Sequence, residues 1–232
     1  MSLKQGKIMG IVGESGSGKS SLLKAICKFI PIQKGRIFID GVDVAKFSNK
    51  EFFPHRKKIQ MIPQDFCDIF NPKMTVKKIL TEPLEVHFPD LSPKEKEVRI
   101  LELLELVELD DSLIGRLPSQ LSGGQRQRIS IARALAVNPK ILICDEIVSS
   151  CDLYTQKQVL LLLQKLNRIK NLTILFVSHN IVAVMQLCHS IMVMYRGNFL
   201  ESGNPEKLCM SPNNVYTQSL IDAVPRIKMI KK

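Results

Sequence analysis

The sequence contains no apolar run long enough to cross a membrane. A spanning helix needs about 20 predominantly apolar residues, and the apolar runs here are far shorter. The first of them, residues 8–12, is followed at once by Gly13 and Glu14, which do not continue a signal peptide. We therefore expect neither a transmembrane helix nor a signal peptide, so that work at a membrane requires other subunits to span it.

The sequence also lacks the cysteine and histidine spacings that are typical of metal sites. Its six cysteines include no CxxC pair, and its four histidines stand apart. Neither a zinc site nor an iron–sulfur site is indicated, and we expect reduced thiols. The cysteines are Cys27, Cys67, Cys144, Cys151, Cys188 and Cys209.

Tryptophan is absent, and aromatic residues make up only 6% of the chain. The net charge of +11 suits nucleic acid, an anionic membrane surface or simply a Lys-rich proteome. The basic residues are scattered apart from residues 56–58 and 228–232, and no basic stripe carries interleaved aromatics. Nucleic acid is therefore a minor alternative as a partner.

The order of apolar segments and turn signals indicates one α/β domain over residues 1–232. Apolar runs typical of buried strands alternate with segments of helical spacing, which favours a mainly parallel sheet. Asp40 and Gly41 form a turn between two short segments, as in an antiparallel hairpin. The expected strands are residues 7–12, 36–39, 42–44, 59–62, 141–144, 173–177, 191–195 and 198–200, and helices are expected at 19–29, 125–136 and 155–168.

A helical insert is expected over about residues 75–125, where helix-forming residues dominate. Ser92 and Glu95 make a capping box with Pro93 at the first helical position. The apolar residues that we expect to mark the buried face of this helix are Val98, Leu101, Leu104 and Val107.

A glycine-rich segment joins the first strand to the first helix. Backbone N–H groups and a helix N-terminus hold a polyphosphate best, because several of them can converge on it without bulky side chains. We expect Lys19 to bridge the β and γ phosphates and Ser20 to place its hydroxyl on Mg²⁺. The predicted ATP-binding residues are Gly13, Glu14, Ser15, Gly16, Ser17, Gly18, Lys19, Ser20 and Ser21.

Two acids follow the apolar run 141–144, at a strand end where ligands of open α/β sheets bind. Asp145 is expected to hold Mg²⁺ and Glu146 to polarise the attacking water; the alternative is that both acids cap a helix. His179 follows another strand and is predicted to contact the γ phosphate. Gln64 ends a short strand, and its amide can reach Mg²⁺ or the water. The histidines His55, His87 and His189 are expected to be ordinary surface or core residues.

A five-residue motif lies between the glycine-rich segment and the acidic strand end. It consists of Leu121, Ser122, Gly123, Gly124 and Gln125. Its chance probability is of order one in a million per position. With this motif the chain resembles the ATPase subunit of an ABC transporter, and the resemblance covers essentially the whole sequence. It implies a P-loop NTPase fold of the ABC ATPase type, with a mainly parallel sheet, a small antiparallel β subdomain and a helical insert.

The resemblance also implies paired subunits. In such proteins two ATPase subunits pack head to tail, so that Ser122 and Gly124 complete the ATP held by the partner. Ser149 and Asp152 correspond to the D-loop, which crosses that interface. Gln64 corresponds to the Q-loop that senses the membrane partner. ATP and Mg²⁺ are the implied cofactors.

Residues 71–76 and the tail 215–225 resemble the oligopeptide, dipeptide and nickel importer group. This implies a second, different ATPase subunit, two transmembrane permeases and an extracytoplasmic solute-binding protein, with the chain peripheral at the cytoplasmic face of the cell membrane. The alternatives are a soluble ABC-type ATPase acting on nucleic acid or ribosomes, a non-hydrolysing regulatory cassette and an exporter half.

Three departures from the family pattern stand out. Ile147 and Val148 replace the usual Pro-Thr, while residues 150–151 replace Ala-Leu in the D-loop; the acids stay in place, so we expect hydrolysis to survive. Only 18 residues precede Lys19. We expect that the N-terminal strands, with the aromatic residue that stacks on adenine, are missing; the alternative is that the lost stacking weakens adenine binding by about 1 to 3 kcal/mol.

Overall fold

The computed structural model describes residues 1–65, 69–149 and 151–223. Its centre is a six-stranded sheet in the order β4-β5-β6-β1-β7-β8, and a second sheet contains β2 and β3. Pairing in the main sheet is parallel except between β7 and β8, and β2 and β3 are antiparallel. The predicted α/β fold class is therefore confirmed. The strands are β1 (Ile8–Val12), β2 (Phe38–Ile39), β3 (Val42–Asp43), β4 (Ile59–Ile62), β5 (Ile141–Asp145), β6 (Thr173–Val177), β7 (Ser190–Tyr195) and β8 (Asn198–Gly203).

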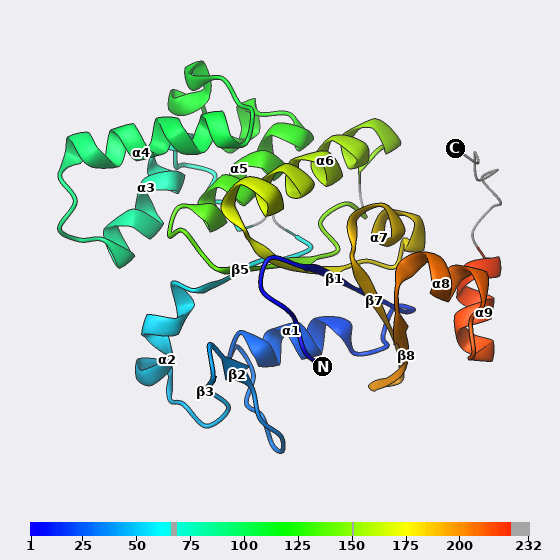
Figure 1. Ribbon diagram of the computed structural model, residues 1–232. Coiled ribbons are helices and arrows are strands. Elements are labelled where there is room, and N and C mark those ends of the chain that lie inside the picture. The colour runs from blue at the N-terminus through cyan, green and yellow to red at the C-terminus, as the bar shows by residue number, and fades with distance from the viewer. Residues whose placement is uncertain (66–68, 150, 224–232) are drawn as a thin grey trace.

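Helices pack on both faces of this sheet. In Figure 1, α1 lies on one side of the strands and α5 and α6 lie on the other, with α3 and α4 farther out. The helices are α1 (Lys19–Ile26), α2 (Asn49–Arg56), α3 (Val76–His87), α4 (Pro93–Leu106), α5 (Gly123–Leu135), α6 (Leu153–Lys170), α7 (Ile181–Leu187), α8 (Pro205–Met210) and α9 (Val215–Asp222), and short 3₁₀ helices span Asp111–Gly115 and Pro118–Gln120.

The strand residues alternate between two hydrophobic cores. Ile8 and Val12 of β1 belong to the larger core, whereas Met9 and Ile11 belong to the core that contains Leu23 of α1. Successive side chains of a strand point to opposite faces of the sheet. Because both faces are covered, the strand is apolar throughout, which is why the sequence shows it as an unbroken apolar run.

The expected buried face of α4 was half wrong. Leu104 and Val107 are buried, but Val98 is 57% exposed and Leu101 is 41% exposed. Within the helix, Leu104 is buried together with Ile100 and Leu103, which take the places expected for Val98 and Leu101. These residues follow the i, i+3, i+4 spacing of one helix face, and both candidate stripes are apolar, so the sequence alone does not select between them.

Helix ends follow local capping. The capping box of Ser92 and Glu95 is present as predicted. Helix α1 stops at Ile26, short of the predicted end, and Lys28 beyond it has a left-handed φ of 60°. Helix α6 starts at Leu153 because the Asp152 carboxylate accepts the N–H groups of Tyr154 and Thr155.

Some sequence expectations fall outside the described residues. They concern Cys67, the D-loop residue Ser150 and the tail beyond residue 223. Within the described part of the chain, no helix has the length and hydropathy needed to cross a membrane.

Candidate functional site

The glycine-rich segment forms a tight loop between β1 and α1. Gly18 is the N-cap of α1 with a left-handed φ of 101°, a conformation that glycine adopts at no steric cost. A Cβ on Gly13 would lie 2.1 Å from the Met194 carbonyl oxygen. The loop therefore lies against the end of β7, and it leads into the N-terminus of α1, where the first N–H groups of a helix have no partner within the helix.

Lys19 is buried inside this loop, with only 3% of its surface exposed. Its ammonium donates to the carbonyl oxygens of Gly13 and Glu14, each at 2.8 Å, and lies 3.9 Å from Glu146 Oε1. Burial lowers the pKa of Lys19, and the nearby carboxylates of Glu146 and Asp145 partly offset this effect. The loop thus holds a positive charge at the place where a polyphosphate would be held.

Ser20 and Asp145 meet across the end of β5. The Ser20 hydroxyl donates to Asp145 Oδ1 at 3.3 Å, and Asp145 is only 4% exposed. Burial raises the pKa of Asp145, while the Ser20 hydrogen bond opposes the shift. A hydroxyl and a buried carboxylate are hard oxygen donors, and the carboxylate lacks full compensation of its charge, so these residues fit Mg²⁺.

A cavity of about 280 Å³ brings eight of the predicted residues to one place. Gln64, which follows β4, lines it together with the loop and with Glu146. The parallel strands β4 and β5 therefore deliver Gln64, Asp145 and Glu146 to the same sheet edge, as expected for open α/β sheets. The lining residues are Ser15, Gly16, Gly18, Lys19, Ser20, Ser21, Gln64 and Glu146.

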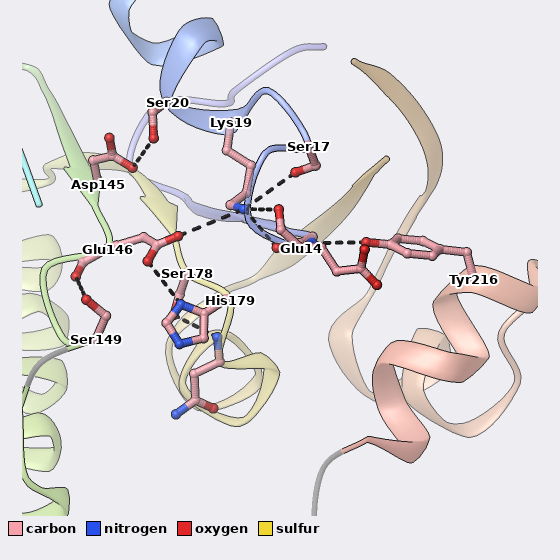
Figure 2. A network of polar contacts seen from close by, with 12 residues as sticks. Glu14, Ser17, Lys19, Ser20, Asp145, Glu146, Ser149, Ser178, His179 and Tyr216 are labelled. Carbon is pink, nitrogen blue, oxygen red and sulfur yellow. Dashed lines mark hydrogen bonds and ion pairs between the residues drawn. The ribbon is translucent and has the colours of Figure 1, made fainter. Parts of the chain in front are cut away.

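Glu146 directly follows β5 and is held by hydrogen bonds to β6 and to His179. Its N–H donates to the carbonyl oxygen of Val177 at 2.9 Å, and its Oε2 lies 3.0 Å from His179 Nδ1. Figure 2 shows Lys19 and His179 reaching the two oxygens of this carboxylate. Glu146 has a left-handed φ of 49°, which is unusual for a residue other than glycine and concentrates at functional sites.

The five-residue motif does not line this cavity. Ser122 caps α5 and accepts the N–H of Gln125 at 3.2 Å, while Gln125 accepts the N–H of Ser122. Neither Gly123 nor Gly124 has a positive φ. A Cβ on Gly123 would meet nothing within 4 Å, and one on Gly124 would meet Thr155 at an ordinary 3.5 Å. The fold of this chain therefore does not itself require either glycine.

The two D-loop residues have separate local partners. Ser149 Oγ donates to the carbonyl oxygen of Glu146 at 2.8 Å, and Asp152 caps α6. Ser149 thus lies beside the predicted base.

The structure adds two side chains that the sequence analysis missed. The N–H of Glu14 donates to the Tyr216 hydroxyl at 3.0 Å, and buried Gln127 donates to the carbonyl oxygen of Ile147. Tyr216 is in the tail that resembles the importer group, and Gln127 lies two residues after the end of the five-residue motif. Spacing along the chain gives no signal for either contact.

Of the other histidines, His189 accepts the N–H of Ile8 at 3.0 Å, which ties β1 to the start of β7.

Known proteins resemble this chain over most of its length. A family model described as ABC transporter matches residues 1–149. The oligopeptide transport ATP-binding protein OppF of Streptococcus mutans is 42% identical over 95% of this chain and 72% of its own length. OppF of Haemophilus influenzae is 40% identical over 96% of this chain and 67% of its own length. A putative peptide import ATP-binding protein of Brucella abortus is 39% identical over 98% of this chain and 68% of its own length.

Solved structures of ATP-binding cassettes share the fold of this chain. The dimeric, post-hydrolysis ATP-binding cassette MJ0796, bound to ADP and Pi, superposes with a TM-score of 0.79 at 31% identity, covering 88% of each chain. The structure of cbiO1 from Clostridium perfringens, part of the transporter complex cbiONQ, gives a TM-score of 0.83 at 26% identity over 91% of this chain and 82% of that one.

Proposed function

The chain belongs to the ABC transporter family of ATP-hydrolysing subunits, and we propose that it is the motor of a peptide importer. The supporting observation is the meeting of Lys19, Ser20, Asp145 and Glu146 at one sheet edge. Peptide is favoured over nickel as cargo because the relatives described above carry peptide transport or import in their names.

In this proposal the loop residues 13–21 bind the phosphates of ATP. Lys19 already lies inside the loop, and its ammonium carries three N–H donors, so it can donate to phosphate oxygens while it keeps its contact with the Gly13 carbonyl oxygen. Ser20, Asp145 and Gln64 would hold Mg²⁺, which when bound supplies positive charge to the phosphate oxygens. Because Asp145 is buried, its charge acts on the site with little screening by water.

Glu146 is the proposed general base. One carboxylate oxygen would accept a proton from the attacking water, while His179 fixes the orientation of the other oxygen at 3.0 Å. His179 is half exposed, so its ring can also contact the γ phosphate. Gln64 lines the same cavity and would orient the water or bind Mg²⁺.

The five-residue motif is proposed to act on a second ATPase subunit. Gly123 and Gly124 leave the N-terminus of α5 uncovered although the chain's own packing does not require them. Backbone N–H groups at a helix start bind anions, so Ser122 and Gly124 can complete the ATP site of a partner. Ser149 and Asp152 would lie at the same interface.

The other proposed partners are two transmembrane permeases and an extracytoplasmic solute-binding protein. We propose that the chain is peripheral at the cytoplasmic face of the membrane and that its ATPase partner is a different subunit. Closure of the two subunits on ATP would then drive the permeases.

Uptake of labelled cargo tests this proposal. Cells that lack the gene should lose uptake of labelled oligopeptides, the parent gene should restore it, and a Lys19→Ala gene should not. Uptake of nickel is measured in parallel. Loss of nickel uptake with unchanged peptide uptake would reject the peptide assignment, and full rescue by Lys19→Ala would reject the loop as the ATP site.

A further inference from the structure

One peptide unit of the phosphate loop is held at both ends. The carbonyl oxygen of Gly13 accepts from Lys19 Nζ at 2.8 Å, and the N–H of Glu14 donates to the Tyr216 hydroxyl at 3.0 Å. These two groups belong to the same peptide bond. Because a trans peptide is planar, its C=O and N–H point in opposite directions, so the position of one fixes the direction of the other.

This geometry links Tyr216 to Lys19. If the Gly13–Glu14 peptide rotated, its carbonyl oxygen would turn away from the Lys19 ammonium. The hydrogen bond to Tyr216 favours the orientation in which that carbonyl oxygen faces Lys19. Figure 2 shows that Tyr216 and Lys19 reach the backbone of the phosphate loop at Glu14 from opposite sides.

The Tyr216 ring is itself fixed by packing. It lies 4.3 Å from the Tyr195 ring at the end of β7, measured between ring centroids. Residue 216 is at the start of α9, where the Asn214 side chain accepts its N–H at 2.9 Å. The next residue, Thr217, is completely buried.

The segment before α9 is tied to β8. The Glu201 carboxylate accepts the N–H of Asn213 at 2.9 Å and the Asn213 side-chain amide at 3.2 Å. The hydroxyl that meets the phosphate loop is therefore placed by β7, β8 and α9 together, which are rigid supporting elements rather than a free side chain.

We propose that Tyr216 is a positioning residue for nucleotide binding, through which helix α9 holds the phosphate loop ready for a nucleoside triphosphate. Tyr216 acts on the Gly13–Glu14 peptide and, through it, on Lys19. The inference rests on the proposed role of residues 13–21 as the phosphate loop. It assigns a role to a contact that joins residues 202 positions apart.

The experiment measures binding of the fluorescent analogue MANT-ATP to the full chain. Tyr216→Phe keeps the ring and removes the acceptor, so the Kd for MANT-ATP is expected to rise about three- to tenfold, the usual scale for one hydrogen bond. The KM for ATP should rise by the same factor with kcat unchanged. Hydrogen exchange of a peptide covering residues 9–18 should become faster. The matched control is Val215→Ala, which truncates the neighbouring side chain, 87% exposed, and should change none of these values.

A second variant separates this inference from the proposed function. Lys19→Ala should abolish MANT-ATP binding. If it does and Tyr216→Phe binds like the parent, the positioning role is wrong while the loop assignment stands. If Lys19→Ala binds like the parent, the loop assignment itself fails. A lowered Tm of Tyr216→Phe with unchanged Kd and KM would reduce Tyr216 to a structural contact and overturn the inference.

Discussion

His179 Nδ1 lies 3.0 Å from Glu146 Oε2, and this pair joins the ends of two neighbouring strands. Lys19 Nζ lies 3.9 Å from the other oxygen, Oε1. A carboxylate that is held at both oxygens has little freedom to rotate. The direction in which Glu146 presents its lone pairs to the cavity is therefore set before any substrate is bound, which is the kind of preorganisation that lowers a reaction barrier.

Replacing Glu146 by Gln should separate binding from hydrolysis. The amide keeps the size of the side chain but accepts no proton from water, so kcat should fall by about 10²–10⁴ while the Kd for ATP changes little. Phosphate release and MANT-ATP binding measure the two quantities. The matched control is Glu105→Gln on the exposed side of α4, which should leave both unchanged. Hydrolysis by Glu146→Gln at the parent rate would show that another group is the base.

Replacing His179 by Ala should lower kcat by about 10², because Glu146 loses the contact that orients it. Since the two residues act as a unit, their effects should not add. The double variant Glu146→Gln/His179→Ala should therefore lose less than the product of the two single losses, and any loss beyond that of Glu146→Gln alone reports the proposed contact of His179 with the γ phosphate. Additive losses in single-turnover measurements would mean that His179 works independently of Glu146.

Replacing Asp145 by Asn should stabilise the nucleotide-free protein while removing its response to Mg²⁺. The carboxylate is buried, and burial raises its pKa, so its charged form costs folding free energy near neutral pH. The amide has no such charge and can still accept the Ser20 hydroxyl. We expect a higher Tm without nucleotide and little ATPase activity at any Mg²⁺ concentration. A lower Tm together with a normal Mg²⁺ titration would contradict both parts.

Much of the fold could be predicted because its strands carry an unmistakable pattern. Strands buried on both faces appear as short apolar runs, as in β5 and β6, and the predicted bounds of both agree with the structure to within one residue. The buried stripe of α4 could not be predicted, because Val98 and Leu101 are as apolar as Ile100 and Leu103. Which stripe is buried depends on where α3 and α5 lie, and that is tertiary information.

The site divides in the same way. Lys19, Asp145 and Glu146 belong to local motifs whose chemistry depends on residue type and spacing, and the structure places them together. The contact of Tyr216 with Glu14 depends on a tail that returns to the loop after 202 residues. Periodicity and motif spacing carry no information about such a return.

Glu108, just after α4, tests how much its ion pairs with Arg128 of α5 and Lys165 of α6 contribute to stability. Hydrogen bonds from Lys165 and Arg128 hold the pKa of Glu108 below its ordinary value. A carboxyl with a lowered folded pKa contributes stability above its unfolded pKa and loses it as the pH falls through the folded pKa. Because Glu108 is 45% exposed, Glu108→Gln should cost less than about 1 kcal/mol after solvent screening. The difference in Tm between parent and variant should be largest near pH 7 and should shrink below about pH 4. A difference that grows on acidification would mean that the pairs destabilise the fold.

Replacing Gly123 by Ala tests whether the five-residue motif serves a partner. A Cβ at this position would meet nothing within 4 Å in this chain, and its φ is not left-handed, so the Tm should stay equal or rise slightly, since alanine is the better helix former. If the partner's ATP lies against this helix start, the added methyl group occupies its place, and ATPase activity of the assembled complex should fall at least about tenfold, a loss equivalent to about 1.4 kcal/mol. Gly115→Ala is the matched control, because a Cβ there also meets nothing within 4 Å and the residue ends a 3₁₀ helix outside the motif. Full activity of the Gly123→Ala complex would show that no nucleotide of a second subunit approaches this glycine.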